Sequence, residues 1–275
     1  MFVTRFAPSP TGDLHRGHAF SALTAFEAAR AAGGRFILRI EDIDATRCRP
    51  QFEAGVYEDL AWLGLTWETP ARRQSEHLDD YQAALARLEA DGLLYRCFRT
   101  RREVAEAMAS APHGAMEVFR GRPLPLADEM RRLAAGEPFA WRLSLDAAAR
   151  RLGGFGDLTF TEEGEGVIRA RPELGGDVVL ARKDVGVAYH LAVVVDDALQ
   201  GITHVIRGQD LFEATHVQRL LQALLGLPTP LYRHHALLTG PDGKRFAKRD
   251  RAETLRSLRE RGMSAATLRR ELGFD

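Results

Sequence analysis

The run Arg5–His18 constrains what this chain can form more than any other feature of the sequence. It joins an apolar strand candidate, Val3–Phe6, to a turn rich in Pro, Ser and Gly, and then to the start of a helix. His15 and His18 stand three positions apart at that start, so both side chains lie on one helix face. Because a helix N-terminus offers unpaired N–H groups and a positive dipole end, the pattern favours a polyphosphate ligand. Gly17 lacks a Cβ, which would let a flat base stack close to the backbone.

The segments that follow predict an α/β fold with a doubly wound parallel sheet. A helix over about 17–32 ends at a Gly-Gly pair, and a buried strand follows over 36–40. Two further helices are expected over about 51–63 and 77–91. Strand, helix and strand in this order imply a right-handed parallel crossover, as in a Rossmann-type sheet.

The character of the chain changes near Tyr95 and returns to an α/β pattern at Asp177. We therefore expect the first half of a Rossmann core over 1–98, an inserted α+β domain over 99–177, the second half of the core over 178–238, and a loop with a helical C-terminal tail over 239–275. After residue 98, the sequence pattern predicts a strand over 139–145 and a helix over 210–225. Three apolar runs lie between them, at 178–181, 189–195 and 202–206.

Composition limits the class of protein. Lys plus Arg and Asp plus Glu both number 38, so nucleic-acid contact would need local basic patches rather than a global field. The start of the chain shows no basic segment followed by an apolar one, and no apolar run approaches the length of a membrane helix. Cys48 and Cys97 are too few for a disulfide framework. We expect a cytoplasmic protein without a membrane segment.

Two motifs together resemble one enzyme family. Arg5–His18 resembles the PSPTG-x-LH-x-GH form of the HIGH motif in glutamyl and glutaminyl class I aminoacyl-tRNA synthetases. Gly243–Lys248 resembles the KMSKS loop of the same class in a degenerate form, with Arg245 at its first lysine, Ala247 at its serine and Lys248 at its second lysine. A basic loop after a Pro-Asp-Gly turn is usually solvated surface, but paired with the first motif it favours an ATP site.

The resemblance implies that an amino-acid carboxylate attacks the α-phosphorus of ATP and expels pyrophosphate. The carboxylate is already ionised, so positioning and charge stabilisation suffice. His15, His18 and Lys248 would be catalytic, and these three with Gly17 would bind ATP. Mg²⁺ would bind mainly to phosphate and water oxygens.

The resemblance also implies that the amino acid is glutamate. Arg5 and Arg207 would grip carboxylates, because guanidinium groups can bind them with two parallel hydrogen bonds. Glu41 would meet the α-amino group, and Tyr189 would line the pocket. The full set of expected glutamate-binding residues is Arg5, Phe6, Ala7, Pro8, Ser9, Glu41, Tyr189 and Arg207. Plainer interpretations remain, in which Arg5 and Glu41 pair with each other and Tyr189 belongs to the core.

One departure from the family concerns zinc. Relatives often hold zinc in the insertion through three cysteines and a tyrosine, whereas only Cys97 aligns here and Arg99 takes the second position. A structural zinc site needs four closed ligands, and Cys97 with His113 does not supply them. We therefore expect no protein metal site and a buried Cys97, unless His113 and carboxylates replace the lost ligands.

Without an anticodon-binding domain after the loop, the chain resembles a family of truncated paralogues, the glutamyl-queuosine tRNA(Asp) synthetases. That family activates glutamate without tRNA and attaches it to queuosine in the anticodon loop of tRNA(Asp). The partners would be glutamate, ATP and the anticodon arm of tRNA(Asp). Phosphates of the tRNA would be contacted by Arg99, Arg101, Arg102 and Arg249. The protein would be a monomer. Two alternatives stay open. One is a truncated glutamyl-tRNA synthetase that charges a 3′ end, and the other is a non-catalytic paralogue that binds tRNA or nucleotide.

Overall fold

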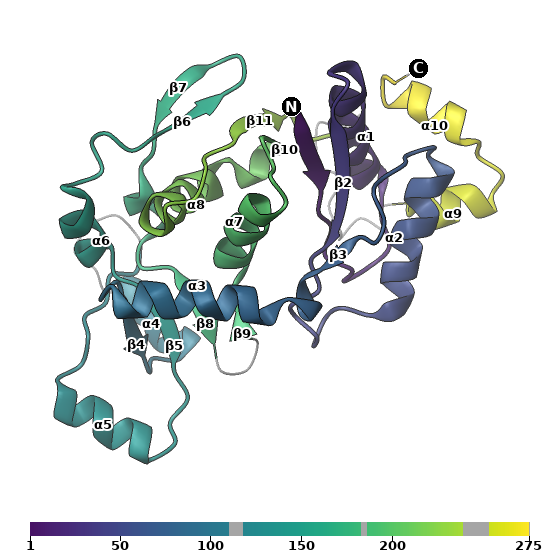
Figure 1. Ribbon diagram of the computed structural model, residues 1–275. Helices are drawn as coiled ribbons and strands as arrows, with labels where there is room; N and C mark the ends of the chain where they lie inside the picture. The colour runs from purple at the N-terminus through teal and green to yellow at the C-terminus, as the bar shows by residue number, and fades with distance from the viewer. Residues whose placement is uncertain (110–117, 183–185, 239–252, 275) are drawn as a thin grey trace.

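The computed structural model describes residues 1–109, 118–182, 186–238 and 253–274. Figure 1 labels the helices and strands along the chain. They are β1 (Val3–Phe6), α1 (Arg16–Ala31), β2 (Arg35–Ile40), α2 (Pro50–Trp62), β3 (Arg72–Arg73), α3 (Leu78–Ala90), β4 (Leu94–Cys97), α4 (Arg101–Ala109), α5 (Leu126–Ala134), β5 (Ala140–Leu143), α6 (Leu145–Leu152), β6 (Thr159–Glu162), β7 (Gly166–Arg169), β8 (Val179–Arg182), β9 (Gly186–Val187), α7 (Tyr189–Leu199), β10 (His204–Gly208), α8 (Phe212–Leu225), β11 (Leu231–His235), α9 (Leu255–Glu260) and α10 (Ala265–Glu271).

Parallel strands form the centre of the molecule (Figure 1). β1 pairs with β2 and β2 with β3, while β10 pairs with β11 and β11 with β6. The two groups meet where β1 lies beside β10. At this seam the Thr203 amide donates to the Val3 carbonyl over 3.0 Å, and the Val3 amide donates to the Thr203 hydroxyl over 2.8 Å. The doubly wound parallel sheet predicted from the sequence is confirmed, and so is the helical C-terminal tail, α9 and α10.

The two faces of this sheet have separate hydrophobic cores. Side chains alternate between faces along a strand, so Val3 and Ile37 pack with α3, α7 and α8. Phe36 and Leu38, one position out of step, pack with α1, α2, α9 and α10. Arg5 and Arg39 follow Val3 and Ile37 by two positions each, which directs both arginines to the face covered by α7.

A second sheet is antiparallel and has the order β4, β5, β8, β9. Strand β5 lies within the expected insertion 99–177, whereas its partners β4 and β8 lie outside that range. The β6–β7 hairpin also lies within the range, and no pattern in the sequence predicted it. β6 joins the parallel strands where Glu162 pairs with Tyr232 of β11. The division of the chain at 98 and 177 remains a prediction.

The apolar run 189–195 lies in a helix, α7. Residues Leu191–Asp197 are all buried, so the helix is enclosed by the protein on nearly all sides. A short continuous apolar run does not by itself separate a buried helix from a buried strand. Across the portions of the chain described here, no helix has both the length and the apolar character needed to cross a bilayer.

Candidate active site

A cavity of about 540 Å³ opens at the carboxyl ends of β1 and β10. Doubly wound sheets bind ligands at such a place, where neighbouring strands have their crossovers on opposite faces. The lining residues are Arg5, Phe6, Ala7, His15, Gly17, His18, Phe20, Ser21, Glu41, Tyr189, Ile206, Arg207, Gly208, Asp210, Leu211, His235, Leu237 and Leu238. The cavity therefore brings together both predicted histidines, Gly17 and the four charged or phenolic pocket residues.

His15 and His18 form the N-terminal cap of α1. His15 Nδ1 accepts the Gly17 amide proton over 3.1 Å, and His18 Nδ1 accepts the His15 amide proton over 3.2 Å. Each Nδ1 is therefore an acceptor, which in a neutral ring places the proton on Nε2. The two rings are close together, with centroids 3.8 Å apart and planes tilted by 32°. Both side chains can present an Nε2–H donor to an anion in the cavity.

Gly17 lies close to the His15 ring. A Cβ at Gly17 would lie 3.0 Å from His15 Cε1 and 3.2 Å from Nδ1. Such a contact is tight, so a side chain there would require the ring to shift by a few tenths of an ångström. The sequence suggested room for a base at Gly17, and the structure adds this second reason for glycine.

The C-terminal tail is anchored beside the first motif. Thr254 forms an antiparallel bridge with His15, and the Leu255 amide donates to the Leu14 carbonyl over 2.8 Å. Leu238, before the KMSKS-like segment, lines the cavity. The described residues on either side of 239–252, Leu238 and Thr254, are thus both beside the site, while Lys248, Arg245 and Ala247 fall outside the described residues.

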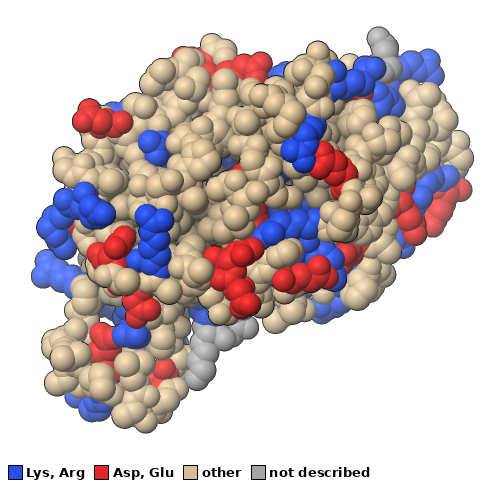
Figure 2. Space-filling view, viewed as in Figure 1, with Lys and Arg blue, Asp and Glu red and all other residues tan. Residues whose placement is uncertain are grey.

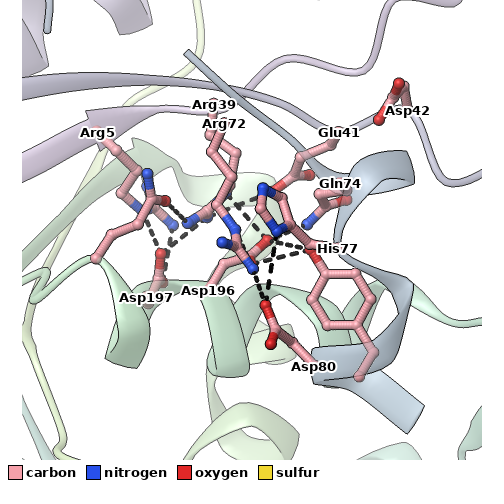
Figure 3. A network of polar contacts seen from close by, with 12 residues as sticks. Arg5, Arg39, Glu41, Asp42, Arg72, Gln74, His77, Asp80, Asp196 and Asp197 are labelled. Atoms are coloured by element: carbon pink, nitrogen blue, oxygen red, sulfur yellow. Dashed lines mark hydrogen bonds and ion pairs between the residues drawn. The ribbon is translucent and has the colours of Figure 1, made fainter. Parts of the chain in front are cut away.

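Arg5 is held by a buried ionic network on the α7 face of the sheet (Figure 3). Its Nε and Nη2 donate to the two carboxylate oxygens of Asp197 over 3.0 and 3.4 Å. Arg39, whose side chain has no exposed surface, donates from Nη2 to Asp197 over 2.8 Å and lies 3.7 Å from Asp196. Arg5 and Arg39 outweigh the effect of burial and hold the pKa of Asp197 below its usual value. Arg5 pairs with Asp197, and the simple Arg5–Glu41 pair is not what the structure shows.

Glu41 follows β2 directly and remains weakly paired. Its Oε1 lies 3.5 Å from Arg39 Nη2. Burial raises its pKa from 4.5 to about 7, although Arg39 and Arg5 oppose that rise and Asp197 adds to it. The Glu41 amide donates to the Pro8 carbonyl over 3.0 Å, which ties the end of β2 to the loop after β1. A cation bound beside this carboxyl group would lower its pKa and so favour the ionised form.

Arg207 lies near the end of β10 among uncharged acceptors. Its Nε donates to His234 Nε2 over 3.0 Å, and its Nη2 donates to the Thr215 hydroxyl over 2.7 Å and to the Leu211 carbonyl over 3.1 Å. Its Nη1 lies 3.5 Å from the Tyr189 hydroxyl. Burial raises the pKa of Tyr189, so the phenol stays protonated.

Three predicted residues lie outside the cavity lining. Pro8 is buried and contributes the carbonyl that accepts from Glu41, and Ser9 is exposed. Cys97 is buried in a small cluster with Tyr95 and Phe119. In the described ranges, no three His, Cys, Asp or Glu side chains gather as metal ligands; His113 falls outside those ranges.

The sequence analysis missed the residues that hold the two cavity arginines. Arg39 and Asp197 had detectable signals: a charged residue inside the apolar strand 36–40, and an acidic pair at the end of the run 189–195. Glu162 and His234 had none, because they lie far apart in the sequence and meet only through the pairing of β6 with β11.

This chain is similar in sequence to class I tRNA synthetases for glutamate and glutamine. A family model described as tRNA synthetases class I (E and Q), catalytic domain, matches residues 1–273. The glutamyl-Q tRNA(Asp) synthetase of Rhodobacter capsulatus is 49% identical, over 99% of this chain and 100% of its own length. Glutamate–tRNA ligase 1 of Parvibaculum lavamentivorans is 41% identical, over 97% of this chain and 58% of its own length.

A solved structure has the same arrangement. The crystal structure of a glutamate tRNA ligase from Elizabethkingia meningosepticum in complex with its amino acid matches with a TM-score of 0.74 at 29% identity. The match covers 90% of this chain and 52% of that protein, so this chain spans about half the length of its structural relative.

Proposed function

Because the chain belongs to the class I tRNA synthetase family for glutamate and glutamine, in its catalytic domain, we propose that it is an ATP-dependent ligase that activates glutamate and transfers it to queuosine in the anticodon loop of tRNA(Asp). The observation that carries this proposal is a single cavity that holds Arg5, Glu41, Tyr189 and Arg207 beside His15 and His18. Relatives named glutamyl-Q tRNA(Asp) synthetase support the choice of acceptor.

In the activation step, a carboxylate oxygen of glutamate forms a bond to the α-phosphorus of ATP, and the bond from that phosphorus to pyrophosphate breaks. No proton needs removal, so the protein's part is to position the reactants and to balance developing charge. His15 and His18 would donate from Nε2 to phosphate oxygens, and Lys248 would act on the leaving pyrophosphate. Mg²⁺ would enter bound to ATP, where it shields phosphate charge.

The amino acid would be recognised by charge. Glutamate carries two carboxylates and one ammonium, and the cavity offers Arg5, Arg207 and Glu41 as complementary groups. In the transfer step, a hydroxyl oxygen of the queuosine cyclopentene diol would form an ester bond to the glutamyl carbonyl carbon. The bond from that carbon to the phosphate oxygen would break, AMP would leave, and the hydroxyl proton would pass to the departing phosphate or to water.

Acidic and basic side chains are interspersed over the face shown in Figure 2, in keeping with the net charge of zero. Contact with tRNA phosphates would therefore depend on local groups such as Arg99 and Arg102, both of which are exposed. Arg249 falls outside the described residues, and the side chain of Arg101 is not described. We further propose that the protein acts as a cytoplasmic monomer, in which the free thiols of Cys48 and Cys97 stay reduced.

ATP–pyrophosphate exchange with glutamate and no tRNA tests the activation step. We expect exchange with glutamate and little with glutamine, since an uncharged amide would leave an arginine of the cavity unpaired. Exchange that requires tRNA, or equal exchange with glutamine, would contradict the proposal.

Transfer to tRNA(Asp) that lacks its 3′ terminal adenosine tests the acceptor. Labelled glutamate should pass to this tRNA when it carries queuosine, and should not pass to intact tRNA(Asp) with unmodified guanosine. The opposite pattern would identify an enzyme that charges the 3′ end, like the glutamate–tRNA ligases among its relatives.

A further inference from the structure

The guanidinium of Arg207 is oriented by a chain of buried groups that ends at Glu162. Arg207 Nε donates to His234 Nε2 over 3.0 Å, and His234 Nδ1 lies 2.8 Å from Glu162 Oε2. The His234 and Glu162 side chains are only 2% and 5% exposed. Neither residue lines the cavity, so both would act on a bound ligand indirectly, and Arg207 is the lining residue whose side chain His234 contacts.

The hydrogen-bond pattern fixes the tautomer of His234. An arginine Nε–H can only donate, so His234 Nε2 must be an acceptor and carries no proton. The Thr215 hydroxyl, 3.2 Å away, also faces this nitrogen. The ring proton therefore lies on Nδ1, where it donates to Glu162. Burial and the nearby Arg207 charge lower the pKa of His234 to about 3, so the ring stays neutral.

Glu162 is itself locked by the sheet. It is the last residue of β6 and pairs with Tyr232 of β11. Its Oε1 accepts the backbone amide of His234 over 2.6 Å, while its Oε2 accepts from the ring of the same residue. The carboxylate thus holds both the main chain and the imidazole of His234, and these two contacts determine the direction of Nε2.

We propose that Glu162 and His234 are positioning residues that fix the orientation of Arg207 for the glutamate substrate. This inference rests on the proposed function. Arg207 has a rotatable side chain, and four acceptors on three different elements define its place: His234 on β11, Tyr189 on α7, Thr215 on α8 and the Leu211 carbonyl just before α8. His234 is the acceptor whose protonation pattern is itself set by another residue.

Glu162→Gln is the sharpest perturbation because it is nearly isosteric. Glutamine has one accepting oxygen, so it cannot place an acceptor at both positions that Glu162 Oε1 and Oε2 occupy, beside the His234 amide and beside Nδ1. If its NH₂ group turns toward Nδ1, the ring proton moves to Nε2 and opposes the Arg207 Nε–H. His234→Leu removes the acceptor outright, whereas His234→Gln keeps an oxygen that can reach Arg207.

His216 provides a matched control. The whole residue is 2% exposed, and the His234 side chain is equally buried at 2%. The His216 ring also packs edge-on against Phe212, at 5.6 Å compared with 5.2 Å for His234. Its Nδ1 accepts from the Arg171 amide over 3.3 Å, away from Arg207. His216→Leu therefore reports the cost of losing a buried histidine from the same core.

The experiment measures KM and kcat for glutamate and ATP by pyrophosphate exchange, with thermal unfolding as the check on folding. Loss of an acceptor for a charged donor should raise KM for glutamate about tenfold or more in Glu162→Gln and His234→Leu. His234→Gln should be milder. The KM for ATP and kcat should change less than about twofold, as expected for lost ground-state binding.

A glutamate KM within about twofold of wild type in folded Glu162→Gln would overturn the inference. So would the same rise in His216→Leu, or equal rises in KM for glutamate and ATP. If His234→Leu does not fold, Glu162→Gln decides alone. Absence of glutamate-dependent exchange in the wild-type protein would instead contradict the proposed function, whatever the variants do.

Discussion

Glutamate binding should depend on pH through the ionisation of Glu41. This carboxyl group is 8% exposed and has one weak cationic contact, Arg39 at 3.5 Å. Burial raises its pKa to about 7. The ammonium group of the substrate would supply the missing positive charge, so ionised Glu41 should bind glutamate and protonated Glu41 should bind it poorly. Affinity is then present above pH 7 and is lost as the pH falls below it.

The size of the effect follows from the pKa. With a pKa of about 7, roughly one Glu41 in eleven is ionised at pH 6 and roughly ten in eleven at pH 8. The affinity should therefore rise about tenfold between these values, or about 1.4 kcal/mol. Three buried groups near the cavity have pKa values that move away from this window. The pKa of Asp197 is lowered, that of His234 is lowered to about 3, and that of Tyr189 is raised.

The assay is the KM for glutamate in pyrophosphate exchange at pH values from 6 to 8, for wild type and Glu41→Gln. Glutamine at this position cannot ionise, so the variant should bind weakly and lose the pH dependence of KM. Calorimetry in buffers of different ionisation enthalpy should show proton release on binding to wild type near pH 7. A flat wild-type profile, or the same profile in Glu41→Gln, would refute the reasoning.

Three further outcomes are expected. Lys248→Ala should lower kcat for activation by about 2.7–4 kcal/mol of transition-state stabilisation with little change in KM for glutamate, and Arg245→Ala should be milder; the reverse order would show that the loop alignment is wrong. Arg39→Met should cost about 3–5 kcal/mol of unfolding free energy in urea titrations, because Asp197 loses a buried partner, and a cost below about 1 kcal/mol would contradict this. Elemental analysis should find no stoichiometric zinc, whereas about one zinc per chain would mean that other groups had joined Cys97 as ligands.

That Glu41 and Arg207 lie close together could be expected from the sequence because both are at strand ends, while their roles in binding stay a prediction. Glu41 follows β2, and Arg207 lies one residue before the end of β10. Carboxyl ends of parallel strands meet at one edge, so local patterns sufficed to predict that these residues would meet. The capping role of His15 and His18 was harder to foresee, since a helix start shows only that both side chains share a face and not which backbone amides they accept.

The supporting residues could not be predicted in the same way. Arg39 alternates with apolar neighbours in β2, but its partners Asp196 and Asp197 come from a helix more than a hundred residues later. Glu162 and His234 meet because a hairpin within the expected insertion adds β6 to the main row of strands. Such pairings depend on strand order, which neither periodicity nor composition determines.

The two arginines of the cavity meet very different surroundings, and this difference bears on substrate choice. Arg5 shares its charge with an ionised carboxylate, Asp197, at 3.0 Å. Arg207 instead donates to a neutral imidazole, two hydroxyls and a carbonyl, and the Glu162 carboxylate stands behind the imidazole. A buried charge held by neutral acceptors is oriented but not balanced, so an arriving carboxylate gains more at Arg207 than at Arg5. Both amino acids carry an α-carboxylate, but at the side-chain end glutamate brings a second carboxylate and glutamine an uncharged amide. Discrimination between them therefore depends on keeping the acceptors of Arg207 neutral, which is what the buried tautomer of His234 achieves.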